Sequence, residues 1–363
     1  MRVLVAMSGG VDSSVAAARL VAEGHEVVGV TMKLWGGESD TGCCSVADVD
    51  DARRVAQQLG VAHHVWNFGD DFEARVVAPY VDAHRRGATP NPCIECNRHL
   101  KFDRLLRRAV AVGFDAVATG HHARVVRRPD GSRRLARGAD AAKDQSYVLY
   151  VLGQRQLART VLPVGATTKE QVRVEAEALG LRTADKPDSQ DVCFVTSASG
   201  RAGFLGDRLP LRPGRVVDAG GRELGQVPAV ELVTVGQRRG LGLPGGGAPR
   251  YAVDVDVAAA TVRVGGADDL LVDRVVLDRV VWAAGPVEGP LDVQCSAHGA
   301  PHRAVVHPGP AAGDRPAGAG LVEVRFATRQ RRVAPGQSVV LYDGDEVVGG
   351  GSATAAPAGP GPT

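Results

Sequence analysis

The first half of the chain alternates short apolar runs with segments of mixed polarity, a pattern typical of strands followed by helices. Apolar runs that fit buried strands lie at 3–7, 25–32, 63–68 and 115–119. Segments with helical spacing, several of them stopped by glycine, lie at 15–21, 46–59, 70–80, 97–112 and 168–179. A hairpin is expected over 125–135 and an apolar helix over 143–152. The alternation predicts an α/β fold with a doubly wound parallel sheet over residues 1–199.

The pattern changes near Gly200, where helical spacing gives way to short Val-rich runs. These runs lie at 215–218, 232–235, 251–257 and 261–264, and Gly, Pro and Asp-Gly separate them, which predicts strands and turns. We therefore expect a small β-rich central domain at 200–270 and a C-terminal β-barrel at 271–351. The Pro/Ala/Gly-rich stretch 307–320 predicts a mobile loop, and the composition of 352–363 predicts a disordered tail.

A glycine-rich turn follows the first predicted strand and leads into the first predicted helix. It reads Ser8-Gly9-Gly10-Val11-Asp12-Ser13-Ser14. Such a turn presents backbone N–H groups at a helix N-terminus, where they and the helix dipole favour an anion. Gly9 and Gly10 let the backbone approach a phosphate closely, and Ser13 and Ser14 can add hydroxyl donors. No Gly-Lys-Ser/Thr follows, so the turn is not a Walker A loop; it resembles the PP-loop of ATP pyrophosphatases.

Six cysteines lie at positions 43, 44, 93, 96, 193 and 295. Cys93 and Cys96 form a Cys-x-x-Cys pair between a proline-rich stretch at 89–92, which bars a helix, and a helix predicted to begin at Asn97. A helix N-terminus stabilises a thiolate, so this position favours a nucleophilic thiol. The competing interpretation is half of a metal or iron–sulfur site, completed by Cys193. We favour redox or sulfur chemistry, because no second Cys-x-x-Cys or His pair follows at finger spacing.

Composition narrows the classes of function. The formal net charge is +2 and aromatic residues make up 4% of the chain, so neither a strongly basic surface nor a base-stacking platform is indicated. No apolar run reaches the length of about 18 residues that a membrane span needs, so we expect a cytoplasmic protein that does not associate with membranes. Lys169 is expected on the polar face of its helix, without a special role. The adjacent His121 and His122 are expected to point to opposite sides of an extended chain and not to share a metal.

Several motifs occur in an order and spacing that together resemble one family. They are the PP-loop at 8–14, Thr-Pro-Asn-Pro-Cys-x-x-Cys-Asn at 89–97, Lys-Asp-Gln-Ser-Tyr at 143–147, Asp-Ser-Gln-Asp-x-Cys-Phe at 188–194 and Gly-Gln-Arg-Arg-Gly-Leu-Gly at 236–242. From its first residues to about Gly351, the chain resembles the tRNA-specific 2-thiouridylases. The resemblance implies ATP-dependent replacement of the C2 oxygen of the wobble uridine of tRNA by sulfur, after adenylation of that oxygen.

The resemblance also implies roles for individual residues. It implies that ATP, with Mg²⁺ placed in part by Asp12, is bound by Ala6, Met7, Ser8, Gly9, Gly10, Val11, Asp12, Ser13, Met32 and Gly120. It implies that tRNA is contacted by Asn91, Pro92, Cys93, Lys143, Asp144 and Gln145. A persulfide on Cys193 would deliver sulfur to C2, and Cys96 would then form a disulfide with Cys193. The expected sulfur donor is a cysteine desulfurase, acting directly or through a relay protein.

Two regions of the second half bear on tRNA binding. The stretch 236–242 carries Gln237, Arg238 and Arg239, which form either a solvated basic turn or a contact with the tRNA phosphate backbone. Near the C-terminus, relatives often have an Arg-Tyr pair that meets tRNA. The matching region at 293–298 lacks this pair, so a contact of that kind is not predicted there.

Cys93 stands where some relatives carry Asp with a proposed acid/base role. The general acid/base residue and the partner of Cys193, either Cys93 or Cys96, therefore stay open, and we favour Cys96 because it directly precedes Asn97. Two other functions stay as alternatives. One is a PP-loop ligase or amidotransferase that activates a carboxylate by adenylation, which leaves the cysteine motifs unexplained. The other is a metal-bearing RNA-binding module with Cys93, Cys96 and Cys193 as cluster ligands.

Overall fold

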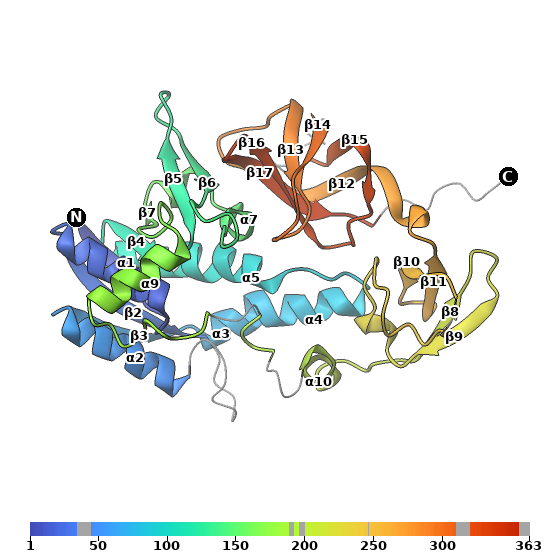
Figure 1. Cartoon of the computed structure of the whole chain (residues 1–363), viewed down its shortest axis with the longest axis horizontal. Helices are drawn as coiled ribbons and strands as arrows, with labels where there is room; N and C mark the ends of the chain where they lie inside the picture. The colour runs from blue at the N-terminus through green and yellow to red at the C-terminus, as the bar shows by residue number, and fades with distance from the viewer. Residues whose placement is uncertain (35–44, 189–191, 196–199, 246, 310–319, 356–363) are drawn as a thin grey trace.

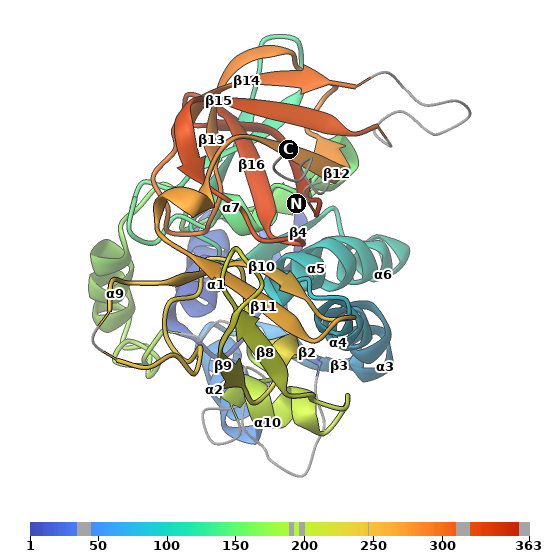
Figure 2. The ribbon, with the colours of Figure 1, turned by 90° about the vertical axis from the view of Figure 1, so that its right-hand side faces the viewer.

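The computed structural model describes residues 1–34, 45–188, 192–195, 200–245, 247–309 and 320–355. The chain forms an N-terminal α/β body, then a small β-sheet, and then a β-barrel (Figures 1 and 2). In Figure 1 the barrel lies above the α/β body, and the small sheet lies at the end of the molecule opposite the N-terminus. Of the helices in the described ranges, none is long and apolar enough to cross a membrane.

The N-terminal body is built on a parallel sheet with the strand order β3-β2-β1-β4-β7. Its strands are β1 (Arg2–Ala6), β2 (Glu26–Lys33), β3 (Ala62–Asn67), β4 (Ala116–Thr119) and β7 (Thr160–Val161). The chain runs outward from β1 to β3 on one side, and β4 and β7 follow on the other. The space between the carboxyl ends of β1 and β4 is therefore a topological switch point, where sheets of this kind bind ligands.

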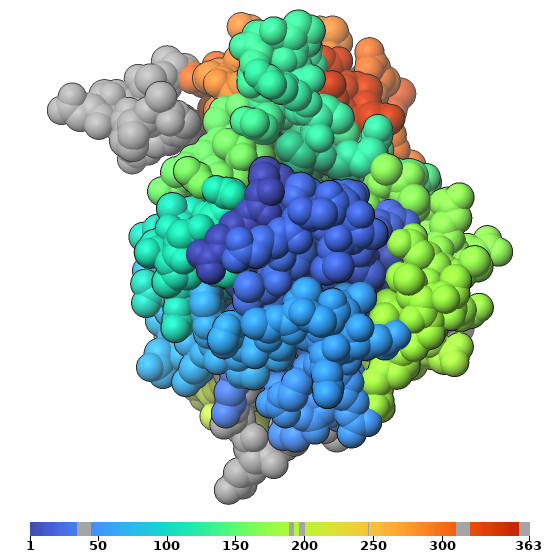
Figure 3. Space-filling view, turned by 90° about the vertical axis from the view of Figure 1, so that its left-hand side faces the viewer, coloured from blue at the N-terminus to red at the C-terminus, as the bar shows by residue number. Residues whose placement is uncertain are grey.

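Helices cover both faces of this sheet. Val3 and Val5 face one helical layer and Leu4 faces the other, since successive residues of a strand point to opposite sides. The first layer contains α1 (Val11–Ala22), α2 (Val46–Gln58) and α9 (Lys169–Ala178), and the second contains α3 (Gly69–Phe72), α4 (Ala78–Arg85) and α6 (Leu106–Ala111). Figure 3 shows the first of these layers from outside, with α1 in dark blue. The predicted doubly wound parallel sheet is thus confirmed.

The helix that carries Cys93 and Cys96 begins at Pro92, not at Asn97 as predicted. It consists of α5 (Pro92–Glu95), the π-helical segment η2 (Cys96–Leu105) and α6. Proline fits the first position of a helix, because the N–H that it lacks would have no intrahelical partner there. The Asn91 side chain caps this end by accepting a hydrogen bond from the Cys93 N–H at 2.9 Å. The predicted helix start was wrong, and both cysteines lie in the first turns of the helix.

Two other predicted helices have different lengths in the structure. The one expected at 70–80 continues from α3 through the π-helical segment η1 (Glu73–Val77) to the end of α4. The one expected at 143–152 shortens to α7 (Ser146–Leu149), followed by α8 (Gln154–Leu157). The Asp144 carboxylate accepts a hydrogen bond from the Ser146 N–H at 3.1 Å, which holds the preceding residues as a loop.

The small sheet has the order β10-β11-β8-β9 and follows α10 (Gly200–Gly206). Its strands are β8 (Gly214–Val217), β9 (Glu223–Val227), β10 (Tyr251–Asp256) and β11 (Thr261–Gly265). The strand predicted at 232–235 is wrong, because a 3₁₀ helix, η3 (Val230–Leu232), stands at its start. Glu231 in this turn is buried, and its carboxylate pairs with Arg212 at 2.9 Å.

The C-terminal body is a closed barrel, because β12 pairs with both β15 and β17. Its strands are β12 (Leu271–Trp282), β13 (Gly289–Gln294), β14 (His302–Pro308), β15 (Val322–Arg331), β16 (Ser338–Asp343) and β17 (Glu346–Ala353). The predicted β-barrel is confirmed. β14 extends to Pro308, so the loop predicted at 307–320 begins later than expected, and 310–319 lies outside the described residues. β17 runs to Ala353, beyond the predicted barrel end, and most of the predicted tail at 352–363 lies outside the described residues.

The predicted hairpin at 125–135 is present and joins the α/β body to the barrel. It consists of β5 (Ala123–Arg127) and β6 (Arg133–Arg137), and β6 pairs with β17. One apolar cluster includes Phe102 and Tyr147 from the α/β body and Val340 and Tyr342 from the barrel. The Arg137 guanidinium stacks on the Tyr342 ring at 3.8 Å from its centroid. These contacts fix the barrel relative to the carboxyl ends of β1 and β4.

Candidate functional site

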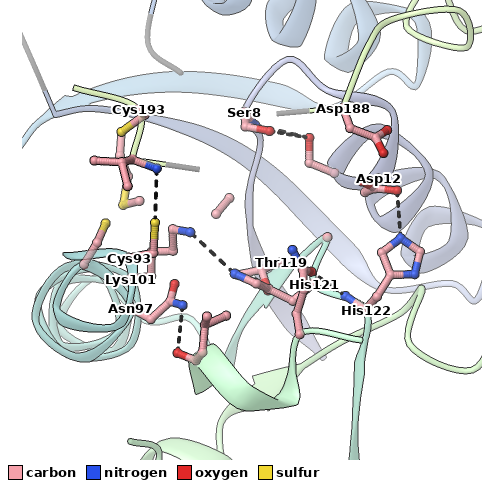
Figure 4. Close-up of a pocket in the computed structure, with 18 of the residues that line it drawn as sticks. Ser8, Asp12, Cys93, Asn97, Lys101, Thr119, His121, His122, Asp188 and Cys193 are labelled. Atoms are coloured by element: carbon pink, nitrogen blue, oxygen red, sulfur yellow. Dashed lines mark hydrogen bonds and ion pairs between the residues drawn. The ribbon is translucent and has the colours of Figure 1, made fainter. Parts of the chain in front are cut away.

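A pocket of about 470 Å³ opens at the topological switch point of the parallel sheet (Figure 4). Its walls come from the ends of β1, β2 and β4, from the cysteine helix, from α9 and from the segments around 143, 193 and 297. The predicted site residues that line it are Ala6, Met7, Ser8, Asp12, Ser13, Met32, Asn91, Pro92, Cys93, Cys96, Gly120, Lys143, Asp144, Gln145 and Cys193. Motifs that are far apart in the sequence therefore meet in one cavity. Gly9, Gly10, Val11, Gln237, Arg238 and Arg239 are not among its lining residues.

The glycine-rich turn has the backbone shape that its sequence predicts. Gly9 has a φ of +74°, a left-handed conformation that favours glycine. A Cβ atom on Gly120 would lie 2.6 Å from the Ser13 nitrogen, so glycine lets the end of β4 approach the start of α1. The Ser13 hydroxyl accepts from the Ser8 N–H at 3.2 Å and donates to the Gly10 carbonyl at 3.1 Å. Ser14 is fully buried and donates to the same carbonyl at 2.9 Å, so it is not the pocket donor that we expected.

One side of the pocket, which we call the phosphate side, carries a chain of alternating charges. The Asp12 carboxylate binds the His122 Nε2 at 3.0 Å and the Lys169 Nζ at 2.6 Å. Lys169 also contacts the Asp188 carboxylate at 3.0 Å. Asp188 in turn accepts from Lys143 at 2.8 Å and from Arg173 at 2.8 Å. These residues come from α1, the connection between β4 and β5, α9 and the loops at 143 and 188, so the network links the PP-loop to Asp188.

The network keeps both of its carboxylates ionised. Burial alone would raise the pKa of Asp12, but hydrogen bonds from His122 and Lys169 outweigh it and lower that pKa. Burial also opposes ionisation of Asp188, and the contacts with Lys143 and Lys169 hold its pKa well below the usual range. Near neutral pH the phosphate side therefore contains fixed negative charges that already have cationic partners.

The expected role of Asp12 in placing Mg²⁺ meets an obstacle in this arrangement. One Asp12 oxygen is engaged by His122 and the other by Lys169. Among the described residues, no group of three or more His, Cys, Asp or Glu side chains could hold a metal ion. In this structure both Asp12 oxygens thus have partners within the protein, and Mg²⁺ bound together with ATP at Asp12 stays a prediction. The same geometry gives no support to a cluster held by Cys93, Cys96 and Cys193.

The opposite side of the pocket, which we call the thiol side, contains Cys93 and Cys193 (Figure 4), and Cys96 lines the pocket with them. Cys96 is buried in an apolar cluster, and Cys193 packs against the same cluster. The Cys93 sulfur accepts a hydrogen bond from the Val192 N–H at 3.4 Å. Val192 has a φ of +56°, which is a strained conformation for a β-branched residue. Both thiols of the Cys-x-x-Cys motif therefore lie near the segment that carries Cys193.

Cys295 does not belong to this site. Cys295 is not among the pocket-lining residues, and burial raises the pKa of its thiol to about 12, which makes it unreactive near neutral pH. Cys43 and Cys44 lie outside the described residues.

The adjacent histidines at the end of β4 have separate partners, as the extended chain predicts. His122 belongs to the phosphate side, whereas the His121 Nδ1 lies 2.7 Å from the Thr119 hydroxyl. The Lys101 ammonium lies 3.5 Å from His121 Nε2, and because an ammonium only donates, this nitrogen accepts and Nδ1 carries the proton. Burial, together with Lys101 and His122, holds the pKa of His121 well below its usual value. His121 is therefore a neutral wall residue.

Two buried polar atoms of pocket residues have no hydrogen-bond partner. They are Asn97 Oδ1 and His122 Nδ1. The Asn97 amide nitrogen donates to the Val148 carbonyl at 3.0 Å, which fixes the orientation of the amide and leaves its oxygen unsatisfied. A buried polar atom without a partner costs about 1–3 kcal/mol. Unsatisfied atoms at the wall of a cavity are typical of a binding site whose ligand completes the hydrogen bonding.

Comparison with known proteins agrees with this geometry. The family models described as tRNA methyl transferase HUP domain, tRNA methyl transferase PRC-barrel domain and aminomethyltransferase beta-barrel domain match residues 1–197, 202–266 and 273–353. The tRNA-specific 2-thiouridylase MnmA of Mycobacteroides abscessus is 50% identical over 96% of this chain and 98% of its own length. This chain belongs to the tRNA-specific 2-thiouridylase family. A second 2-thiouridylase, from Mycolicibacterium smegmatis, is 48% identical over 98% of this chain and 99% of its own length.

Two solved structures are similar to this 2-thiouridylase chain at low sequence identity. A 4-thiouridine synthetase–RNA complex with bound ATP is 18% identical, with a TM-score of 0.35, over 52% of this chain and 44% of that one. The U34-tRNA thiolase NcsA from Methanococcus maripaludis is 18% identical, with a TM-score of 0.34, over 57% of this chain and 65% of that one. A likeness at this level carries no argument about the 2-thiouridylase site.

Some of the residues expected to contact tRNA are hydrogen-bonded within the protein, whereas others are exposed. The Asp144 carboxylate is buried and binds Arg137 at 3.0 Å, the Gly138 N–H at 2.9 Å and the Ser146 hydroxyl at 2.8 Å. It therefore holds a loop of this 2-thiouridylase and has little capacity left for a ligand. The Gln237 amide donates to the Arg239 carbonyl at 2.8 Å and shapes its turn. Arg238 and Arg239 in the same turn are exposed, away from the pocket.

Sequence reasoning missed several residues of the 2-thiouridylase pocket, among them Lys169 and His298. Lys169 was expected on a polar helix face, but it is buried and forms the centre of the phosphate side. That expectation was wrong because its partner Asp12 lies on another helix, 157 positions earlier in the chain. His298 lies in the region that lacks the Arg-Tyr pair, yet it lines the pocket together with Ala297. Gln294 holds this barrel loop by donating to the Ala297 carbonyl at 3.1 Å.

Proposed function

We propose that this chain is an ATP-dependent tRNA 2-thiouridylase that replaces the C2 oxygen of the wobble uridine by sulfur. One observation carries the proposal: a phosphate-binding turn and the thiols of two separate motifs line the same pocket. A PP-loop ligase without sulfur chemistry has no use for Cys96 and Cys193 opposite its nucleotide. Membership of the 2-thiouridylase family supports the same reaction.

Adenylation is the first proposed step. The uridine O2 attacks the α-phosphorus of ATP, the bond to the β-phosphate oxygen breaks, and pyrophosphate leaves with its electron pair. The N–H groups at the start of α1 face the phosphates, and Lys169 and Lys143 supply positive charge as negative charge moves onto the leaving group. The C2 oxygen becomes part of an AMP leaving group.

Sulfur transfer is the second proposed step. The terminal sulfur of a Cys193 persulfide attacks C2, and AMP departs with the original oxygen. The Cys96 thiolate then attacks the Cys193 sulfur, the persulfide S–S bond breaks, and the uridine keeps the terminal sulfur. Cys96 and Cys193 are left as a disulfide, which a thiol reductant reopens. Packing of both residues against one apolar cluster supports this pairing.

The partners follow from this chemistry. The substrate is a tRNA with a wobble uridine, and the sulfur donor is a cysteine desulfurase or a sulfur-relay protein. The exposed Arg238 and Arg239 lie outside the pocket, where they suit contacts with the tRNA backbone. We infer that the protein works in the cytoplasm, where tRNA and a sulfur donor meet.

The proposal is tested by mass analysis of tRNA nucleosides after incubation with ATP and a sulfur source. Wild-type protein is expected to produce 2-thiouridine and Cys193→Ser to produce none. Cys295→Ser is the matched control, because Cys295 lies outside the pocket and has a raised thiol pKa. Undiminished 2-thiouridine with Cys193→Ser would contradict the proposed sulfur carrier, and no 2-thiouridine with wild-type protein would contradict the reaction itself.

A further inference from the structure

The Asp188 carboxylate forms ion pairs with three cationic side chains near the PP-loop. Lys143 contacts its carboxylate at 2.8 Å, Lys169 at 3.0 Å and Arg173 at 2.8 Å. Lys169 is only 10% exposed, and Lys143 is 45% exposed. Lys143, Lys169 and Asp188 all line the pocket. The Asp188 carboxylate thus pairs with three cations, of which Lys143 and Lys169 line the cavity, and it shares Lys169 with Asp12.

This cluster has the composition of a phosphate site. Ammonium and guanidinium groups form their strongest hydrogen bonds with carboxylates and phosphates, and a helix N-terminus adds backbone donors. The cluster is connected to the start of α1 through Lys169, which also contacts Asp12 in the first helical turn. A pyrophosphate group that lay against the PP-loop would come within reach of the same cations and would carry more negative charge than Asp188.

We propose that Asp188 is a built-in competitor for the pyrophosphate part of ATP. Without nucleotide, the Asp188 carboxylate forms ion pairs with Lys143 and Lys169. When ATP binds, its β- and γ-phosphates form ion pairs with these two lysines and replace Asp188. The cations are thereby kept paired in the empty pocket, where unpaired charges would be costly.

Lys143 has a different role in this proposal from the one that the family resemblance implied. The resemblance assigned it to tRNA, whereas its contact with Asp188 places it in the cationic cluster. The inference rests on the proposed function for the identity of the anion. Its test uses inorganic pyrophosphate alone, without tRNA or sulfur, so its failure and the failure of the thiolation proposal are distinguishable.

The test is calorimetric titration of the full chain with inorganic pyrophosphate. Asp188→Asn is expected to bind pyrophosphate about tenfold more tightly than wild type, since the competing charge is gone while the side-chain shape is kept. Asp185→Asn is the matched control, because Asp185 is an exposed carboxylate on the same segment and outside the pocket lining. Asp185→Asn is expected to change the affinity by less than about twofold.

A second variant separates competition from general electrostatics. Lys143→Gln should weaken pyrophosphate binding, and should do so more strongly in the Asp188→Asn background, where Lys143 is no longer shared. Thermal melts confirm that each variant is folded, and Asp188→Ser replaces Asp188→Asn if the latter is not. Equal or weaker pyrophosphate binding by the Asp188 variant would overturn the proposal, as would a Lys143→Gln effect that is the same in both backgrounds.

Discussion

The two sides of the pocket differ in polarity: one is charged and the other is apolar. The phosphate side is a network of ion pairs in which the Asp12 and Asp188 carboxylates share the Lys169 ammonium. The thiol side is apolar: Cys96 and Cys193 pack against a cluster that contains Phe72 and Phe194, whose rings lie 5.6 Å apart. Cleavage of ATP needs dispersal of negative charge, whereas a persulfide must be kept from water and from thiols in solution. Each side therefore provides the medium that its half of the proposed reaction requires.

This contrast implies that the two half-reactions can be damaged separately. A change on the thiol side should stop sulfur transfer and spare ATP cleavage. A change on the phosphate side should slow ATP cleavage and leave the thiols as reactive as before.

The largest effect is expected from the cysteine helix. Cys96→Ser should lower 2-thiouridine formation by about 10³-fold or more, because the thiol that releases sulfur from Cys193 is lost. Cys93→Ser should cost less than about tenfold, since Cys93 contacts the Val192 N–H and holds the segment in place. Intact mass after turnover without reductant should show a Cys96–Cys193 disulfide in Cys93→Ser. A disulfide that survives in Cys96→Ser and is absent in Cys93→Ser would reverse the assignment.

A smaller effect is expected from the phosphate side. Lys169→Met should slow pyrophosphate release by about 10²-fold, because a positive charge next to the leaving group is lost. The rate at which Cys193 reacts with iodoacetamide should stay unchanged. Lys186→Met is the matched control, because Lys186 pairs with Asp48 and Asp51 and does not line the pocket. Normal pyrophosphate release by folded Lys169→Met would show that this ammonium serves only stability.

The smallest effect is expected on the pH dependence of stability, through His121 in the pocket wall. The pKa of His121 is lowered in the folded state, so the unfolded chain binds the proton more readily. Stability from neutral His121 is thus fully present above its unfolded pKa of about 6.5 and falls below it, by at most about 1.4 kcal/mol per pH unit. Urea unfolding between pH 8 and pH 5 should show a shallower loss for His121→Gln than for wild type. An equal loss in both proteins would mean that His121 is not the group that titrates.

The sequence predicted the parts of the structure that depend on local pattern. The apolar run at 3–7 predicted β1, and the glycine-rich sequence after it predicted the turn at Gly9 and the start of α1. Both signals depend only on residues that are close in the sequence. Cys96 and Cys193 were predicted to share one site because both belong to motifs of the family, and both line the pocket. The helix start at Pro92 was missed, although its sequence signal is local. The pair Asn91-Pro92 is typical of a capped helix N-terminus as well as of a loop.

The sequence could not predict features that depend on distant partners. Lys169 stands at the first position of a polar helix, and only Asp12 and Asp188 make it a pocket residue. The pairing of β6 with β17, at Ala136 and Glu346, joins segments that no periodicity connects. The same holds for His298, whose place depends on how the barrel docks.

The central claim is that one pocket holds two separable half-reactions. It is tested most directly by a single-turnover experiment with Cys193→Ser, tRNA and ATP, in which pyrophosphate and 2-thiouridine are measured in the same samples. The account predicts tRNA-dependent pyrophosphate release without any 2-thiouridine. Formation of 2-thiouridine, or the absence of pyrophosphate release from folded Cys193→Ser protein, would contradict it.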